Sequence, residues 1–190
     1  MRQAAFLDRD GVLNKPILRN GSVGSPRSLA EFELFEDAVD CVAKLQAAGL
    51  LVIVVTNQPD VARGTLDPKE LERMHDWLKR TTAVDAIYAC SHDDGDNCFC
   101  RKPKPGLLLR AASEWSITLS TSYMVGDSWK DIDAGNSAGC QTFLVDPAQS
   151  QTGQTRASYR VRDLRSAVEM ITLRSTPRMN PFRINRAIFK

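Results

Sequence analysis

The amino-acid sequence predicts an α/β fold: a doubly wound parallel sheet with helices on both of its faces. Short apolar runs of strand length alternate along the chain with longer segments of helical spacing. This order of elements is the one that builds a parallel sheet covered by helices. No internal repeat and no second set of elements interrupts the alternation. We therefore expect one domain over residues 1–173.

Each element has its own signal in the sequence. The apolar run 3–7 predicts a buried strand that ends at Asp8, and the Gly-, Pro- and Ser-containing stretch 14–28 predicts a loop. The segment 37–48 is apolar on one helical face and is followed by Gly49, a common residue just past a helix end. The same reasoning predicts strands at 50–55, 86–89, 122–125, 141–145 and 159–161, and helices at 68–80, 107–115, 131–138 and 163–173.

The remaining residues, 174–190, carry five basic side chains and no acidic one. We expect them to form a basic C-terminal tail. Terminal segments of this kind are usually solvated or packed on the surface. The alternative is a contact with an anionic partner or with a second subunit.

Length and composition limit the classes of function. The 190 residues fit one domain with a full core, and 43% hydrophobic and 25% charged residues are typical of globular proteins. A net charge of +2 argues against a nucleic-acid-binding protein, and no apolar run approaches the length of a membrane span. Charged residues follow the first Met almost at once, so no signal peptide is predicted. We expect a cytoplasmic monomer or small homo-oligomer.

Polar side chains follow three of the predicted strands. Asp8 and Asp10 follow the first strand, Thr56 and Asn57 the second, and Asp127 the fourth. Ligands of open parallel sheets bind beyond the carboxyl ends of the strands, so we expect these side chains to meet at one edge. Several carboxylates near a phosphate would repel one another unless a cation such as Mg²⁺ lay among them. A carboxylate is also a competent nucleophile in phosphoryl transfer.

An isolated Asp-x-Asp pair is more often a turn or capping feature, but here three other segments accompany it. FLDRDGVLN, VVTNQ, RKPKPG and VGDSWKDIDAG resemble, in order and spacing, the four motifs of the haloacid dehalogenase superfamily of aspartyl-phosphate phosphatases. Within it, the chain resembles the subgroup of histidinol-phosphate and heptose bisphosphate phosphatases. The resemblance implies a Rossmann-like haloacid dehalogenase fold with a minimal cap and a zinc loop. It also implies a Mg²⁺-dependent phosphatase that acts on a small phosphorylated metabolite.

The resemblance assigns roles to individual residues. It implies that Asp8 is the nucleophile and a Mg²⁺ ligand. It implies that Asp10 is the general acid and base, and that the Asp10 backbone carbonyl also binds the metal. Asp127 would be the other Mg²⁺ ligand. The remaining implied roles are phosphoryl binding by Thr56 and Lys102, substrate contact by Asn57 and Arg101, and an outer-shell position for Asp131.

A cysteine and histidine cluster forms a second candidate metal site. Cys90 and His92 make one close pair, and Cys98 and Cys100 make another after a gap of five residues. Three cysteines and one histidine are a common set of ligands for structural zinc. The alternative is three reduced cysteines and a solvent-facing histidine in a polar loop. The zinc loop of the subgroup has the same residue types at matching positions, which favours one structural Zn²⁺.

The sequence departs from the heptose bisphosphate phosphatases after the first motif. The stretch KPILRNGSVGSPRSL is more basic than their loop, and Ser128 stands where they often have a basic residue. The five-residue gap in the zinc loop is closer to histidinol-phosphate phosphatases, but VARG and KPKPGLLL are closer to the heptose enzymes. D-glycero-D-manno-heptose 1,7-bisphosphate is therefore the expected substrate, with histidinol phosphate as the alternative. We expect cations without partners near the mouth of the site, Arg101 and Lys104 together with Arg19 or Arg27, as contacts for a second phosphate. The alternative is that these cations are solvated or only steer anions toward the site.

Two other classes of protein share part of this pattern. An inactive relative that serves as a binding module would not need the complete set Asp8, Asp10, Thr56, Lys102 and Asp127. A phosphorelay receiver domain shares the doubly wound fold and the aspartyl phosphate. It has no use, however, for a second aspartate two residues further on or for a zinc loop. The sequence therefore favours the phosphatase.

Overall fold

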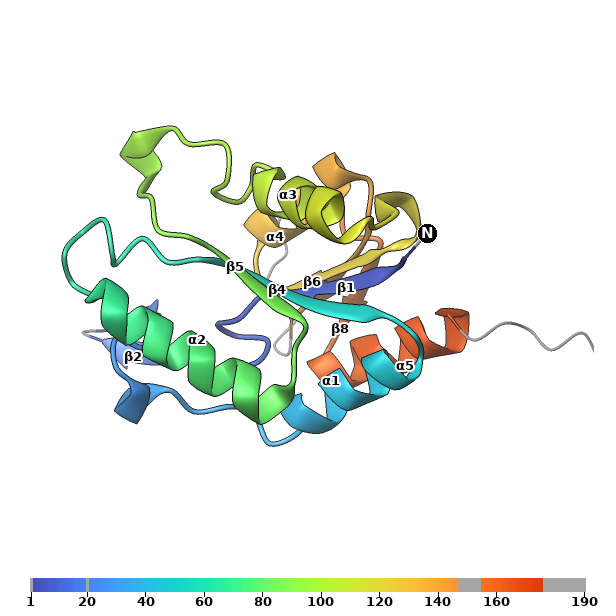
Figure 1. Ribbon diagram of the computed structural model, residues 1–190, viewed down its shortest axis with the longest axis horizontal. Coiled ribbons are helices and arrows are strands. Elements are labelled where there is room, and N and C mark those ends of the chain that lie inside the picture. Colours follow the sequence, from blue (N-terminus) through green and yellow to red (C-terminus); the bar gives the residue numbers. More distant parts are fainter. Residues whose placement is uncertain (1, 20, 147–154, 176–190) are drawn as a thin grey trace, which may run out of the picture.

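A central six-stranded sheet with helices on both faces forms the frame of the protein (Figure 1). The computed structural model describes residues 2–19, 21–146 and 155–175. The strands lie in the spatial order β5–β4–β1–β6–β7–β8, and every neighbouring pair is parallel. The predicted doubly wound sheet is confirmed. Its strands are β1 Ala4–Leu7, β4 Leu51–Asn57, β5 Ala86–Cys90, β6 Tyr123–Gly126, β7 Gln141–Val145 and β8 Tyr159–Val161.

The helices of the described residues are divided between the two faces of the sheet. α1, α2 and α5 cover one face, and α3 and α4 cover the other (Figure 1). Each face has its own apolar core, built around residues such as Leu45 and Met74 on the first and Leu108 on the second. The helices are α1 Ala38–Ala47, α2 Pro68–Thr82, α3 Gly106–Trp115, α4 Trp129–Ala138 and α5 Leu164–Ser175.

Strand β1 lies in the middle of the sheet and is buried along its whole length. Its register aligns Leu7 with Val54 of β4 on one side and with Val125 of β6 on the other. Beyond this level β4 continues to Asn57 and β6 to Gly126, and the residue after β1, Asp8, donates its backbone N–H to the Val125 carbonyl at 2.9 Å. This alignment fixes the place where strand-end side chains meet.

The stretch 14–28 is not only a loop, contrary to the prediction. Strands β2 (Ile17–Arg19) and β3 (Ser22–Gly24) form an antiparallel hairpin outside the central sheet. Its apolar pair, Leu18 and Val23, is 72% and 74% exposed, so the hairpin has no buried face to produce an alternating pattern. The Asn-Gly dipeptide at 20–21 is the signal that would have predicted it, because this pair favours tight hairpin turns.

The predicted strand at 159–161 and the predicted helix after it are both confirmed in the C-terminal part of the described chain. Helix α5 ends at Ser175, two residues into the segment expected to be a tail. Residues 176–190, the rest of that expected tail, lie outside the described residues. Across the described ranges, none of the helices combines the length and the apolar character that crossing a bilayer requires.

Candidate active site and metal centres

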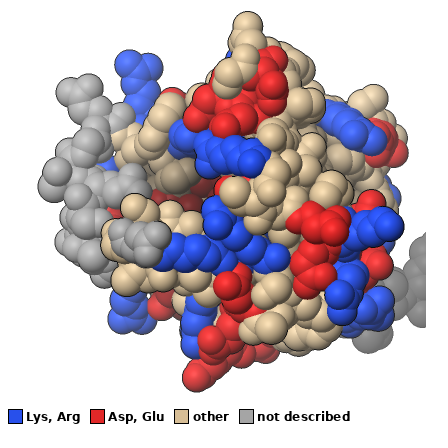
Figure 2. Space-filling view, turned by 90° about the vertical axis from the view of Figure 1, so that its left-hand side faces the viewer, with Lys and Arg blue, Asp and Glu red and all other residues tan. Residues whose placement is uncertain are grey.

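A cavity of about 690 Å³ opens at the carboxyl ends of β1, β4 and β6. Figure 2 looks onto this side of the molecule, where acidic atoms are visible in a recess between basic side chains. The lining includes every residue that the sequence assigned to phosphoryl transfer: Asp8, Asp10, Thr56, Asn57, Arg101, Lys102, Asp127 and Asp131. Four segments that are far apart in the sequence therefore meet in one cavity.

Lys102 lies at the base of the cavity between two carboxylates. Its buried ammonium donates to Asp8 Oδ1 at 2.8 Å, to Asp131 Oδ1 at 2.5 Å and to the Val55 carbonyl at 2.8 Å. Burial alone would lower the pKa of Lys102, but the charges of Asp131 and Asp8 outweigh it and raise that pKa. Lys102 is therefore a fixed positive charge directly beside Asp8.

Asp127 completes a trio of acids with Asp8 and Asp131, whose carboxylate oxygens lie within 4.8 Å of one another. Burial and the neighbouring Asp131 charge raise the pKa of Asp127 to about 7, and the same causes raise the pKa of Asp8 well above its usual range. Gly11 makes room for this trio, since a Cβ at its position would lie 2.1 Å from Asp127 Oδ2.

The charges around this trio fit a divalent cation. Three carboxylates and the Lys102 ammonium leave two negative charges in a buried site, which one Mg²⁺ would balance. Carboxylate and carbonyl oxygens are also the ligands that Mg²⁺ prefers.

Asp10 is held by hydrogen bonds on both carboxylate oxygens. Arg9 donates from Nε and Nη2, Asn14 from its amide, Ser25 from its hydroxyl and Gln58 from its amide, all between 2.8 and 3.2 Å. Burial would raise the pKa of Asp10, but the Arg9 charge and the hydrogen bonds outweigh it and lower that pKa. Asp10 is therefore ionised at rest and has a fixed orientation.

Thr56 and Asn57 end β4 but face different partners. The buried Thr56 hydroxyl accepts a hydrogen bond from Gln58 Nε2 at 2.9 Å. The Asn57 amide donates to the Lys102 carbonyl at 3.0 Å and accepts from the Lys102 N–H at 3.1 Å. Asn57 therefore ties the Lys102 segment to the end of β4.

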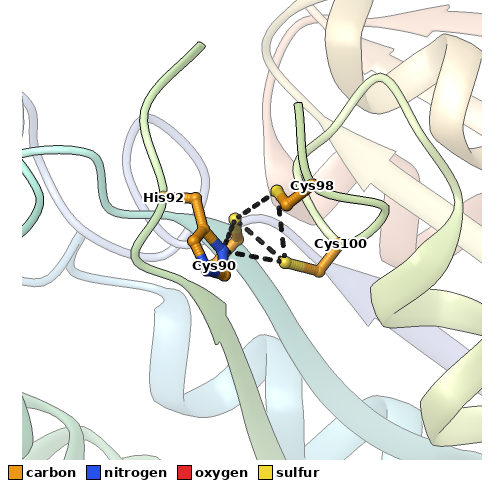
Figure 3. Close-up of side chains that lie close together, drawn as sticks. All are labelled: Cys90, His92, Cys98 and Cys100. Carbon is orange, nitrogen blue, oxygen red and sulfur yellow. Dashed lines mark hydrogen bonds between the residues drawn. The ribbon is translucent and has the colours of Figure 1, made fainter. Parts of the chain in front are cut away.

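The cysteine and histidine cluster is assembled as the sequence predicts (Figure 3). The three sulfurs lie 3.2 to 3.6 Å apart, and His92 Nδ1 lies 3.3 to 3.6 Å from two of them. Four ligands at zinc–sulfur distances of about 2.3 Å would be separated by about 3.8 Å in a tetrahedron. The side chains point toward one common centre, and no disulfide joins them. The ligand set therefore fits a closed tetrahedral metal site.

Three of the four cations expected to lack partners are paired with acids, contrary to the prediction. Arg19 pairs with Glu31, Arg27 Nε with Asp60 at 2.7 Å, and Arg101 Nε with Asp94 at 2.7 Å. Lys104 does not line the cavity, because its ammonium donates to Asn97 and to the Cys98 carbonyl. Sequence reasoning placed these charges in the right region but had no means to identify acidic partners from distant segments.

Several residues of the site were missed by sequence reasoning. Arg9, Asn14, Ser25 and Gln58 surround Asp10, and Lys130 lines the cavity beside Ser128. Four of these residues lie within the segments that carry the resemblance: Arg9 and Asn14 in FLDRDGVLN, Gln58 at the end of VVTNQ, and Lys130 in VGDSWKDIDAG. Ser25 carries no such signal, because the hairpin before it sets its position.

Known proteins share this combination of fold and site. Residues 99–167 match the HAD-hydrolase-like family model. A D-glycero-beta-D-manno-heptose-1,7-bisphosphate 7-phosphatase from Pasteurella multocida is 34% identical over 90% of this chain and 97% of its own length. A Pseudomonas aeruginosa protein of the same name is 38% identical over 76% and 81%. The crystal structure of D,D-heptose 1,7-bisphosphate phosphatase from B. bronchiseptica, complexed with magnesium and phosphate, covers 92% of this chain and 99% of its own. It superposes with a TM-score of 0.79 at 32% identity.

The fold and the site, together with these relatives, thus define a phosphatase with a candidate cation site at the end of a parallel sheet. The chain belongs to the haloacid dehalogenase superfamily, in the subgroup that contains the heptose 1,7-bisphosphate phosphatases. It is a phosphoric monoester hydrolase, and the predicted enzyme class is confirmed.

Proposed function

We propose that this protein hydrolyses the 7-phosphate of D-glycero-D-manno-heptose 1,7-bisphosphate. The observation that carries the proposal is the division of the cavity into two parts. Asp8, Lys102 and the acid trio lie at its base, and basic side chains surround its mouth. One phosphate would react at the base while the other is bound at the mouth. The names of the relatives in Pasteurella and Pseudomonas support this substrate.

The reaction follows from the residues at the base. Asp8 attacks phosphorus as the bond to the sugar oxygen breaks, and Asp10 gives a proton to the leaving oxygen. A water molecule then gives a proton to Asp10, attacks the aspartyl phosphate and releases phosphate. Because Asp10 is ionised at rest, it first takes up the proton for the leaving oxygen from solvent water, and the arriving phosphate dianion favours the uptake by raising the pKa of Asp10 through repulsion. Lys102 and the Thr56 hydroxyl neutralise and bind the nonbridging oxygens.

Mg²⁺ would be held by the carboxylates of Asp8 and Asp127 and by the Asp10 backbone carbonyl. Asp131 would stay in the outer shell, because Lys102 and Ser128 already donate hydrogen bonds to its carboxylate. The ion supplies positive charge against the nonbridging oxygens and keeps Asp8 ionised. The donor set and its excess negative charge support this assignment.

Magnesium affinity should fall as the pH drops below about 7. With no metal bound, Asp127 takes up a proton near pH 7, and this proton must leave before the carboxylate binds Mg²⁺. We expect the dissociation constant to rise up to about 10-fold per pH unit between pH 7 and pH 5. Isothermal titration calorimetry at pH 8, 7 and 6, in buffers of different ionisation enthalpy, measures both the affinity and the released proton.

The same pKa has the opposite effect on the metal-free protein. The folded state binds this proton more tightly than the unfolded chain, in which the pKa of Asp is about 3.9. Asp127 therefore contributes increasing stability as the pH falls from about 7 to about 4. Asp127→Asn is the control, because it should bind Mg²⁺ weakly and lose this part of the pH dependence. A Mg²⁺ affinity that is independent of pH would contradict the assignment.

We propose that the cluster of Cys90, His92, Cys98 and Cys100 binds one structural Zn²⁺. With four protein ligands, the ion has no open position for water, so a catalytic role is not expected. Cys100 directly precedes Arg101 and Lys102. The zinc would therefore order the segment that delivers both cations to the cavity.

The second phosphate would bind to Arg101 and Lys130. Arg101 is almost buried, but its partner Asp94 is 71% exposed, so a phosphate can replace Asp94 at little cost. Lys130 also lines the cavity and pairs with no carboxylate in the described part of the chain. Its ammonium lies 5.9 Å from the Trp129 ring centroid. Heptose bisphosphate phosphatases often have a basic residue at the position of Ser128. Lys130 would supply that positive charge in this protein.

Arg101→Ala and Lys130→Ala should each reduce kcat/KM for the heptose bisphosphate more than for the heptose 7-monophosphate. The expected difference is about 1.5–3 kcal/mol, the usual loss for one charged hydrogen-bond partner. Steady-state kinetics on both sugars and on histidinol phosphate measure it. Lys104→Ala is the matched control, since Lys104 belongs to the same segment but does not line the cavity. In Lys104→Ala, the ratio of kcat/KM for the bisphosphate to kcat/KM for the monophosphate should stay at the wild-type value.

Two results would favour other functions. Faster turnover of histidinol phosphate than of any sugar bisphosphate would make the protein a histidinol-phosphate phosphatase. Absence of Mg²⁺-dependent turnover of p-nitrophenyl phosphate and of all these metabolites would favour an inactive binding module.

We further propose a cytoplasmic location, because the clustered cysteines serve as metal ligands only when reduced. The other proposals are a single domain over 1–173 with a basic tail, a monomer or small homo-oligomer, and no nucleic-acid or membrane partner.

A further inference from the structure

Gln58 links two of the reacting groups although it does not line the cavity. It directly follows β4, is fully buried and is anchored by its backbone N–H, which donates to the Cys90 carbonyl at 2.7 Å. Its side-chain Nε2 lies 2.9 Å from Thr56 Oγ1 and 2.9 Å from Asp10 Oδ2. One amide group therefore bridges the end of β4 and the segment after β1.

The direction of these hydrogen bonds is fixed by chemistry. An ionised carboxylate only accepts, so the nitrogen of the Gln58 amide must face Asp10. The same nitrogen has a second hydrogen, which it donates to Thr56 Oγ1. Because Thr56 accepts this bond, its own hydroxyl hydrogen must point elsewhere. Thr56 lines the cavity, and no other described group accepts from it, so this hydrogen is available to a bound anion.

A purely structural role does not explain Gln58. Within the described residues, its Oε1 is buried and has no hydrogen-bond partner. Such an unpaired oxygen lowers stability, and an apolar side chain of the same length would avoid this loss. The amide nitrogen is the part that the site uses.

We propose that Gln58 is a positioning residue for the proposed phosphatase reaction. Its amide aims the Thr56 hydroxyl proton at the transferred phosphoryl group and fixes the orientation of Asp10. Both groups are thereby placed before the substrate arrives, so the transition state need not order them. The inference rests on the proposed function of Asp8, Asp10 and Thr56.

Gln58→Met tests this inference, because methionine keeps the length of the side chain and removes both donors. We expect kcat for the sugar phosphate to fall about 10- to 100-fold, with KM changed by less than about 3-fold. The loss should be smaller for p-nitrophenyl phosphate, whose leaving group hardly needs the Asp10 proton. The melting temperature should stay the same or rise, since an unpaired buried oxygen is removed.

A double-mutant cycle separates positioning from packing. In a Thr56→Val background, Gln58→Met should cost at least about 5-fold less than in the wild type, because the hydroxyl that it aims is gone. Gln46→Met is the matched control: the Gln46 amide also donates two bonds, to the Ala83 carbonyl and Asp85, but far from the cavity. This control should keep full activity on both substrates.

The outcomes are distinguishable. Unchanged kcat in Gln58→Met, or losses that are equal on both substrates and fully additive with Thr56→Val, would overturn the inference. Asp8→Asn is assayed in parallel. If Asp8→Asn is inactive while Gln58→Met is fully active, only the role of Gln58 fails. If Asp8→Asn keeps its activity, the proposed function itself fails.

Discussion

Asp8→Asn should abolish turnover and leave the fold intact. Asparagine has the shape of aspartate, but its amide is not a nucleophile and no longer carries the charge that pairs with Lys102. Loss of a covalent nucleophile in comparable enzymes lowers kcat by on the order of 10⁴ or more. The stability of the metal-free protein should not fall, because the substitution removes one of three mutually repelling carboxylates.

Steady-state kinetics with p-nitrophenyl phosphate and Mg²⁺ measure this loss. Beryllofluoride, which mimics an aspartyl phosphate, should modify wild-type Asp8 and should not bind to Asp8→Asn. Asp133→Asn is the matched control, since Asp133 is an exposed aspartate of α4. It should retain wild-type rates. Activity of Asp8→Asn within 10-fold of the wild type would exclude Asp8 as the nucleophile.

Removal of zinc should destabilise the protein and impair catalysis. Metal analysis of protein purified without added zinc should find about one Zn²⁺ per chain, because a closed site with four protein ligands binds tightly. Cys98→Ser should lower the zinc content and reduce the free energy of unfolding by several kcal/mol, a drop in melting temperature on the order of 10 °C. Activity should fall in parallel, since Arg101 and Lys102 follow the last ligand directly.

The control for this substitution is Cys140→Ser. Cys140 is a buried thiol between α4 and β7, outside the cluster. The variant should keep its zinc and its activity. Its free energy of unfolding should fall somewhat, because the substitution buries a polar hydroxyl in place of a thiol. Zinc-free protein with the melting temperature and activity of the zinc-loaded form would refute the structural role of the metal.

The architecture was predictable because burial leaves a local signal. Strands such as β1 and β4 are buried on both faces, so they appear in the sequence as continuous apolar runs. The cluster of candidate zinc ligands was also predictable, because both close pairs lie within one short segment. The β2–β3 hairpin leaves no such signal, since its apolar residues are exposed.

The contacts between side chains were decided by the tertiary structure. Arg9 is fully buried against Asp10, and Gln58 reaches the same carboxylate from a segment 48 residues away. Three arginines at the mouth, Arg19, Arg27 and Arg101, have acidic partners that no motif indicates, such as Asp60 for Arg27.

The sequence by itself thus determined the order of the strands and helices of the central fold, the strand-end position of Asp8 and the four residues of the cysteine and histidine cluster. Each of these depends on residues that are neighbours in the chain. Only the tertiary structure decided that Gln58 joins Thr56 to Asp10 and that the Arg101 side chain pairs with Asp94. A hydrogen bond or ion pair is set by distances of a few ångströms between flexible side chains. Those distances are fixed only when separate segments pack together.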